Sequence, residues 1–303
     1  MGFLYFLEKV RITVLDEIML LITRFGEETA FLVAALIVFW CVDKKKGYFI
    51  LAVGFVGTIT SQFMKLLCRI PRPWDLDGKF SIVEKARKAA EGYSFPSGHS
   101  QSAVGTFGGI GVVSKNRWVK IGAFSIAVLV PFSRMYLGVH TPLDVIVGSM
   151  ISVLLIFALK PIVFSDNGKA MPILLCVMTA LAVGYTSYVE LYPFPADMDA
   201  HNLASGIKNA YTLLGALCGF LVVYIVDQKW LNFSTKAIWW AQILKVVLGL
   251  VVVLVVKSCL KEPLNALLGE FSGRAFRYFL VVIAAGILWP LTFRLLPESK
   301  SEG

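Results

Sequence analysis

Long apolar segments follow one another along most of the chain and predict membrane-spanning helices. A helix needs about 20 residues to cross a hydrocarbon core of about 30 Å. We expect about nine spans, of which the first and third are short, at residues 29–43, 47–68, 100–114, 119–139, 142–164, 170–190, 207–226, 237–257 and 276–296. The pattern therefore predicts an all-α fold, a polytopic bundle of membrane helices.

The first 28 residues do not follow this pattern, because charged and apolar positions are closely mixed. Glu8, Lys9, Arg11, Asp16 and Arg24 stand among leucines, isoleucines and phenylalanines. This density of charge does not suit a span or the apolar region of a signal peptide. It is typical of an amphipathic helix that lies in the membrane interface. We expect such a helix over residues 1–28, and no cleaved targeting segment.

The composition also indicates a membrane protein. The 303-residue chain is 57% hydrophobic and 16% charged. Such a composition gives more apolar surface than one soluble core can bury, and a bilayer is the solvent that accommodates the excess. We therefore expect an integral membrane protein.

The formal charge of +9 lies largely in connections between the expected spans. Three basic clusters fall on one side if the spans alternate: residues 43–47, residues 114–120, and Lys229 with Lys236. The positive-inside tendency places that side in the cytoplasm, so loops 69–99, 138–142 and 191–205 face outward. This arrangement predicts a plasma-membrane protein with no nucleic-acid partner. Loop 69–99 is itself basic, which calls for lipid headgroups or a phosphate substrate near it.

A first candidate constellation is the segment KLLCRIPRPW. Lys65 ends an apolar helix, and Arg72 follows it between Pro71 and Pro73. Each proline fixes its own φ and biases the preceding residue toward extended conformations, so the arginine is presented on a stiff segment. The two cations are either ordinary interfacial residues that reach to headgroups or the first members of an anion site.

A second constellation is the segment PSGH at the start of the next apolar helix. Pro96 favours a helix start, so Ser97 and Gly98 are expected to offer unpaired backbone N–H groups to an anion. Gly98 allows close approach of a ligand to the backbone. His99 could donate a proton to a leaving oxygen. The alternative is a simple helix cap followed by a histidine in the interface.

A third constellation is the segment SRMYLGVHTPLD. Arg134 interrupts an apolar span, which is costly unless it is paired or lines a polar cavity. His140 and Asp144 follow it. Thr141 and Asp144 have the spacing of a capping box. Asp144 could also accept the proton on one ring nitrogen of His140 and so raise the nucleophilicity of the other nitrogen.

Taken together, the three constellations supply what phosphoryl transfer needs without a metal or other cofactor. Fixed cations stabilise the oxygens of the transferred group, one histidine attacks phosphorus, and the other protonates the leaving group. Spacing alone does not rank the two histidines, although the carboxylate partner favours His140 as the nucleophile. We expect no metal ligands in this site.

The order KxxxxxxRP, PSGH and SRxxxxxHxxxD resembles the three-part signature of the type 2 phosphatidic acid phosphatase family, and all three parts match here over residues 65–144. The resemblance implies that five residues bind phosphate: Lys65, Arg72, Ser97, Gly98 and Arg134. It also implies that His140 forms a phosphohistidine, that Asp144 orients it, and that His99 is the general acid. Vanadium haloperoxidases share this site, but they are generally soluble.

The expected organisation follows from these segments. Residues 1–28 form the interfacial helix, residues 29–164 the catalytic helical core, and residues 165–303 additional transmembrane helices of no assigned role. The resemblance implies a metal-independent hydrolase of a lipid phosphate or diphosphate, of the isoprenoid diphosphate, phosphatidate or phosphatidylglycerol phosphate class. Its site is expected at the outer face of the membrane. The alternative is a lipid-phosphate transporter or binding protein without turnover.

The outward loop after residue 190 carries a second group of polar side chains. Glu190, Asp197, Asp199 and His201 could hold a cation weakly, but the prolines among them are typical of a solvated turn. We expect a turn there and no metal site.

Overall fold

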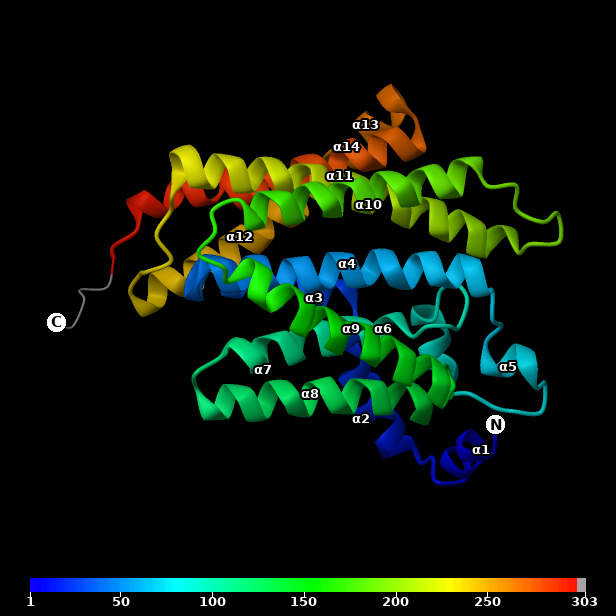
Figure 1. Cartoon of the computed structure of the whole chain (residues 1–303). Helices are drawn as coiled ribbons and strands as arrows, with labels where there is room; N and C mark the ends of the chain where they lie inside the picture. Colours follow the sequence, from blue (N-terminus) through cyan, green and yellow to red (C-terminus); the bar gives the residue numbers. More distant parts are fainter. Residues whose placement is uncertain (299–303) are drawn as a thin grey trace. The chain divides into compact units, whose positions relative to one another are not determined.

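The computed structural model of the chain describes residues 1–298 and is built from helices, with no strand in that range (Figure 1). Seven segments are long and apolar enough to cross a membrane: Lys44–Leu76, Arg117–Tyr136, Pro142–Val163, Ala170–Leu191, Ala200–Leu231, Trp239–Leu268 and Glu270–Leu295. An eighth is counted if one bent pair of helices forms a single span. The expectation of an all-α, polytopic membrane bundle is confirmed, whereas the count of nine spans is not.

The two shortest expected spans account for the difference. Residues 28–42 form α3 (Glu28–Ile37) and a π-helical turn (Val38–Val42), and they make the bent pair, at 57°, with Thr13–Gly26. The expected span at 100–114 is a short helical run, α6 (Gly98–Ala103), a π-helical turn and α7 (Gly109–Val113). At about 1.5 Å per residue this run is about 24 Å long, which is less than the hydrocarbon thickness.

The N-terminal segment forms two helices and a 3₁₀ turn where one helix was expected. These are α1 (Gly2–Lys9), α2 (Thr13–Thr23) and η1 (Arg24–Gly26). Both helices pack against α8 (Arg117–Tyr136). Leu4 and Leu7 of α1 are buried in protein, whereas Phe3 and Phe6 are exposed. The location of this segment in the membrane interface stays a prediction.

The chain forms two compact units. The first contains Met1–Leu32, Ile50–Lys160 and Pro193–Gly206, and the second contains Val33–Phe49, Pro161–Tyr192 and the chain from Ile207 onward. All eight candidate site residues belong to the first unit. The three constellations of the sequence are therefore parts of one body.

The first unit is organised around α8. Asn116 caps this helix, since its side-chain oxygen accepts hydrogen bonds from the amides of Trp118 (2.8 Å) and Val119 (3.3 Å). The helix packs against α2, α6 and α7. The unit is completed by most of α4 (Lys44–Cys68), by α5 (Pro73–Leu76) and η3 (Glu84–Ala89), and by most of α9 (Pro142–Val163).

A small apolar cluster packs at the end of α8, between Arg134 in the last turn of the helix and His140, which follows it. Ala86 of η3 packs with Tyr136, Leu137 and Val139, and all four are buried. The amide of Val83 donates to the carbonyl of Leu137 (3.1 Å). The loop between α4 and α6 is therefore anchored on the end of α8, and it brings its polar backbone close to the site.

The second unit is made mainly of apolar helices: α10 (Ala170–Leu191), most of α11 (Ala200–Val226), α12 (Trp239–Cys259), the short α13 (Lys261–Leu268) and α14 (Glu270–Ile283). At Gly269 (φ +80°) the chain turns so that α13 packs back on α14 (Figure 1). Asp227 is fully buried and accepts hydrogen bonds from Lys44 (3.1 Å) and Tyr48 (3.1 Å). This charge is therefore paired within the unit, as a buried carboxylate must be.

Candidate active site

Lys65 lies in the last turn of α4, and Arg72 lies in the segment that follows this helix. Both side chains are almost completely buried, at 6% and 4% exposure. Arg72 has extended backbone dihedrals and precedes Pro73, the first residue of α5, as the prolines predict. Its guanidinium donates to the carbonyls of Glu91 (2.7 Å), Gly92 (3.0 Å) and Val139 (3.0 Å). Lys65 donates to the carbonyl of Tyr93. Backbone carbonyls thus hold both cations in the buried site.

The start of α6 is arranged largely as expected, with one correction. The Ser97 side chain caps the helix, because its oxygen accepts hydrogen bonds from the amide of Ser100 (3.3 Å) and from the Ser100 hydroxyl (2.9 Å). The backbone N–H of Ser97 is not free, as it donates to the carbonyl of Asp144 (2.9 Å). The expectation of an unpaired amide at Ser97 is therefore wrong, and its hydroxyl hydrogen is the group left to donate.

Gly98 and His99 face a polar space at this helix start. A Cβ atom placed on Gly98 would have the Ser61 hydroxyl as its nearest neighbour, 4.0 Å away, so the site is open at that position. The Nε2 atom of His99 is buried and has no hydrogen-bond partner in the described part of the chain. The same is true of the Ser61 hydroxyl. Ser61 lies one helical turn before Lys65, so both side chains project from the same face of α4.

Arg134 is fully buried on α8. Its Nη1 donates to the hydroxyl of Thr23 (2.9 Å), and its Nε and Nη2 atoms are buried without a partner among residues 1–298. A buried guanidinium with unsatisfied donors is costly, because each lost hydrogen bond to a charged group costs a few kcal/mol, about 1–3. These two donors are therefore available to an anion.

His140 follows α8 and is almost fully buried. Its Nε2 atom lies 2.9 Å from Nη1 of Arg72. A guanidinium can only donate, so Nε2 is the acceptor and carries no proton. The proton of the neutral ring is therefore on Nδ1, and the lone pair on Nε2 is the nucleophilic one.

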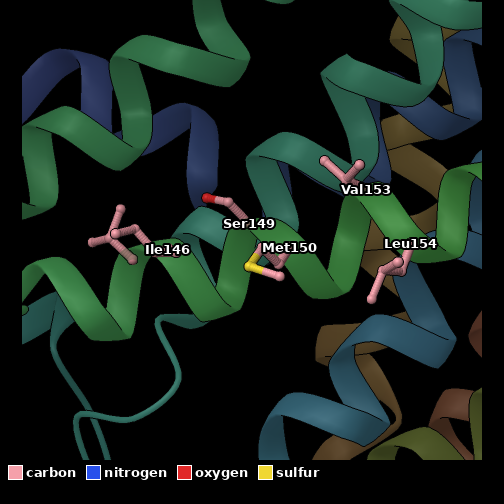
Figure 2. Close-up of a pocket in the computed structure, with 6 residues that line it drawn as sticks. Ile146, Ser149, Met150, Val153 and Leu154 are labelled. Carbon is pink, nitrogen blue, oxygen red and sulfur yellow. The ribbon is translucent and has the colours of Figure 1, made fainter.

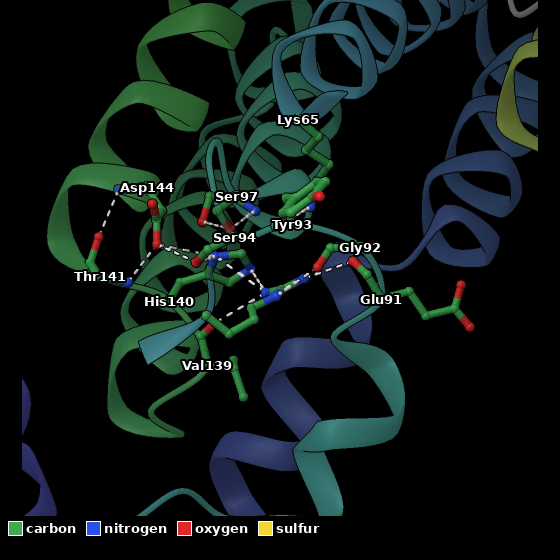
Figure 3. A network of polar contacts seen from close by, with 12 residues as sticks. Lys65, Glu91, Gly92, Tyr93, Ser94, Ser97, Val139, His140, Thr141 and Asp144 are labelled. Atoms are coloured by element: carbon green, nitrogen blue, oxygen red, sulfur yellow. Dashed lines mark hydrogen bonds and ion pairs between the residues drawn. The ribbon is translucent and has the colours of Figure 1, made fainter. Parts of the chain in front are cut away.

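Asp144 caps α9, as the spacing predicts, and also faces His140 (Figure 3). Its Oδ2 accepts a hydrogen bond from the Thr141 amide (2.7 Å), and its own amide donates to the Thr141 hydroxyl (3.3 Å). The same Oδ2 lies 3.6 Å from Nδ1 of His140. One carboxylate thus caps a helix and faces the protonated nitrogen of the ring.

Ser94 lies between these two groups, and the sequence motifs did not point to it. Its hydroxyl donates to Oδ2 of Asp144 (2.6 Å), and its oxygen lies 3.4 Å from Nδ1 of His140. Because its hydrogen is used on the carboxylate, its lone pair faces the N–H of the ring. The contact therefore links His140 to Asp144 through a buried hydroxyl.

The electrostatics of the site follow from burial and from an excess of cations. Burial lowers the pKa of His140 well below its usual range, and the charges of Arg72, Arg134 and Lys65 lower it further. His140 is consequently neutral near pH 7. The site combines these cations with four buried polar atoms that have no partner among residues 1–298, on Ser61, His99 and Arg134. The hydroxyl of Ser61 and the two N–H groups of Arg134 are donors, which suits an anion with several acceptor oxygens.

The first unit has two pockets, and one of them includes a residue of the cluster. A polar pocket of about 580 Å³ has Arg72 in its wall, with Trp74, Arg87, Asp199 and His201 among its other lining residues. Asp199 lies in the turn before α11, whereas His201, expected in that turn, lies in the first turn of α11. An apolar groove of about 330 Å³ runs along one face of α9 (Figure 2), lined by Val145, Ile146, Ser149, Met150, Val153 and Leu154.

Comparisons with known proteins define the class to which this fold and site belong. The model of the PAP2 superfamily matches residues 45–168, and that of the transmembrane extension of PAP2 superfamily phosphatases matches residues 211–301. The chain belongs to the PAP2 superfamily, and it is an integral membrane protein. The resemblance seen in the motifs is thus confirmed. No solved structure matches the chain significantly.

Several curated relatives are similar to parts of the chain. An undecaprenyl-diphosphatase of Sulfolobus acidocaldarius is 30% identical over 46% of this chain and 66% of its own length. Sphingosine-1-phosphate phosphatase 1 of Mus musculus is 23% identical over 79% of this chain and 58% of its own length. Undecaprenyl-diphosphatase BcrC of Bacillus subtilis is 27% identical over 48% of this chain and 72% of its own length. The matched part of the chain thus covers between 58% and 72% of the length of these three relatives.

Proposed function

We propose that this protein is a metal-independent lipid phosphatase that hydrolyses a lipid phosphate or diphosphate through a phosphohistidine at His140. The observation that carries the proposal is the group of buried donors without a partner among residues 1–298, the Ser61 hydroxyl and two N–H groups of Arg134, next to the unpartnered Nε2 of His99 and the neutral His140. These donors suit a tetrahedral anion, since each of its oxygens can accept more than one hydrogen bond. Membership of the PAP2 superfamily supports the same assignment.

In the first step the lone pair on Nε2 of His140 attacks phosphorus. The bond between phosphorus and the lipid oxygen breaks, and His99 donates a proton to that oxygen. Lys65, Arg72 and Arg134, with the Ser97 hydroxyl and the Gly98 amide, stabilise the charge on the other phosphoryl oxygens. The negative charge of the bound phosphate favours the protonated form of His99 before transfer. Asp144 stabilises the positive charge that develops on the ring of His140.

In the second step a water molecule attacks phosphorus of the phosphohistidine. His99, now neutral, takes a proton from the water, and Nε2 of His140 leaves with its electron pair. Inorganic phosphate is released and His99 is again protonated. The same cations stabilise both transition states, so the three fixed side chains supply the charge that metal ions supply in other phosphoryl-transfer enzymes.

A lipid is the substrate class that the surroundings of the site favour. The polar pocket includes Arg72, so a phosphate group can approach the site from it, and the same unit carries an apolar groove on α9. An amphiphile with a phosphate head and an apolar tail suits a unit with both features. Relatives named as undecaprenyl-diphosphatase and sphingosine-1-phosphate phosphatase support the same class. We propose an isoprenoid diphosphate, phosphatidate or phosphatidylglycerol phosphate type of substrate, at the outer face of the plasma membrane.

The proposal is tested by phosphate release from purified protein in detergent or nanodiscs with a metal chelator present. The substrates are phosphatidate, phosphatidylglycerol phosphate, farnesyl diphosphate and a sphingoid phosphate, and the His140→Ala variant is the blank. We expect release from at least one lipid, inhibition by vanadate, and loss of turnover in the variant with its fold retained. Binding of these lipids without release by the parent protein would instead indicate a transporter or binding protein.

A further inference from the structure

We infer that Thr23, in the N-terminal helix α2, is a positioning residue for the phosphate-binding Arg134, so that the N-terminal segment completes the active site. The inference rests on the proposed function, because it concerns how the phosphate is held. Nothing in the motifs indicates it, and the superfamily match begins only at residue 45. Thr23 lies 22 residues before that match.

The contact determines which edge of the guanidinium is available. Thr23 is 3% exposed, and its hydroxyl oxygen accepts a hydrogen bond from Nη1 of Arg134 at 2.9 Å. Nε and Nη2 are the two donors on the opposite edge, and both are buried without a partner within the described residues. Those two parallel N–H groups form the edge that binds phosphate in a bidentate manner. Anchoring Nη1 therefore presents the bidentate edge to the ligand.

The turn that follows α2 lies directly against the other side of the site. A Cβ atom on Gly26 would come within 2.9 Å of the carbonyl oxygen of His99 and 2.8 Å of a methyl carbon of Val130. This approach is closer than a side chain allows, so the glycine lets η1 pack on the start of α6. Residues 23–26 thus contact both Arg134, through the Thr23 hydroxyl, and the backbone of His99, at Gly26.

Three hydrogen bonds hold the N-terminal segment on the end of α8 and on the loop that packs there. Arg11 donates from Nε to the carbonyl of Tyr136 (2.9 Å) and from Nη1 to the carbonyl of Ser81 (2.7 Å). The Tyr136 hydroxyl donates to Asp16 (3.0 Å). Because α2 is fixed along α8 by these contacts, the Thr23 hydroxyl occupies a defined position relative to Arg134.

The test compares Thr23→Val with Thr23→Ser in the full-length protein. Valine keeps the shape of threonine but cannot accept a hydrogen bond, whereas serine keeps the hydroxyl. We expect Thr23→Val to weaken inhibition by vanadate and to lower kcat/KM about tenfold, since a buried hydrogen bond to a charged group is lost. Thr23→Ser is expected to stay close to the parent. Thr13→Val, the same change at an exposed position of α2, is the control and is expected to have no effect.

The outcomes separate the inference from the proposed function. If the parent protein hydrolyses no lipid phosphate, the proposed function is wrong. If the parent is active and Thr23→Val keeps its kcat/KM and its inhibition constant for vanadate, Thr23 does not position Arg134. Equal losses in Thr23→Val and Thr23→Ser would also contradict the inference, because they would indicate packing alone. Should Thr23→Val not fold, Thr23→Ala, which is smaller and also lacks the hydroxyl, is judged by the same two results.

Discussion

At the scale of single residues, His140 is prepared for attack by the groups on its two nitrogens. Arg72 donates to Nε2 at 2.9 Å, which keeps the proton on Nδ1. Ser94 and Asp144 lie 3.4 Å and 3.6 Å from Nδ1. In the proposed reaction the phosphate replaces the hydrogen bond from Arg72 at Nε2, and the positive charge that then develops on the ring faces Asp144. The tautomer required for attack is thus present before substrate binds.

The lowered pKa of His140 predicts a pH profile. Protonation of His140 removes the nucleophile, and burial with nearby cations disfavours that protonation. The acidic limb of kcat/KM that reports His140 is therefore expected below about pH 6.5, the usual value for histidine. The substrate phosphate also titrates near pH 6, so profiles are compared for two substrates with different phosphate pKa values. A limb above pH 7 that is common to both substrates contradicts the assignment.

Ser94 gives a second prediction at this scale. Ser94→Ala removes the hydroxyl that links the ring of His140 to Asp144, so the orientation of the ring and the stabilisation of its charge are weakened. We expect kcat to fall about tenfold with a smaller change in KM, in line with the loss of one buried hydrogen bond to a charged group. Steady-state kinetics with Ser125→Ala, an exposed serine of α8, as the control measure this. An unchanged kcat would show that Asp144 acts without Ser94.

At the scale of elements, the site is assembled from the ends of helices. Arg72 follows α4, Gly98 begins α6, Arg134 lies in the last turn of α8, and Asp144 lies in the first turn of α9. The amide of Ser97 donates to the carbonyl of Asp144 (2.9 Å), which ties the start of α6 to α9. Small residues permit this close arrangement. Gly98 leaves space for a ligand, whereas Gly148 allows α9 to approach the backbone of Ser97.

Gly98 and Gly148 should respond differently to substitution by alanine. A Cβ on Gly98 meets nothing closer than 4.0 Å, whereas a Cβ on Gly148 would lie 2.5 Å from the Ser97 carbonyl oxygen. Gly98→Ala is therefore expected to keep the melting temperature but weaken vanadate binding about tenfold or more, because its methyl group enters the phosphate space. Gly148→Ala is expected to lose about 1–3 kcal/mol of stability. Equal vanadate affinity in Gly98→Ala and the parent would place the phosphate elsewhere.

The sequence predicts some of these elements better than others. The capping box of Thr141 and Asp144 is local, with partners three residues apart, so its spacing is visible in the chain. The contacts of Thr23 with Arg134 and of Ser94 with Asp144 span 111 and 50 residues, and no local pattern encodes them. The expected span at 100–114 is apolar because it is buried in protein, and apolarity alone does not separate that case from burial in lipid.

At the scale of the whole molecule, charge distribution predicts the orientation of the site. The basic cluster at 114–120 and the phosphate-site residue Arg134 lie at opposite ends of one candidate span, Arg117–Tyr136. The positive-inside tendency therefore predicts that the loop 114–120 is cytoplasmic and that the site faces outward.

Labelling of single cysteines tests this orientation. Lys79→Cys and Lys115→Cys are introduced at exposed positions, one at a time, into protein whose five native cysteines are replaced by alanine. A membrane-impermeant maleimide applied to intact cells should label Lys79→Cys at once and Lys115→Cys only after permeabilisation. The reverse pattern would place the site in the cytoplasm.

The most direct test of the central claim is to trap the phosphorylated enzyme. Purified protein is mixed with a lipid substrate carrying labelled phosphate, with a metal chelator present, and the reaction is stopped within milliseconds in base, in which phosphohistidine is stable. The proposed mechanism predicts label on the protein, in the peptide that contains His140, and none in His140→Ala. Release of inorganic phosphate by the parent without any labelled protein, or at the same rate by His140→Ala, would contradict it.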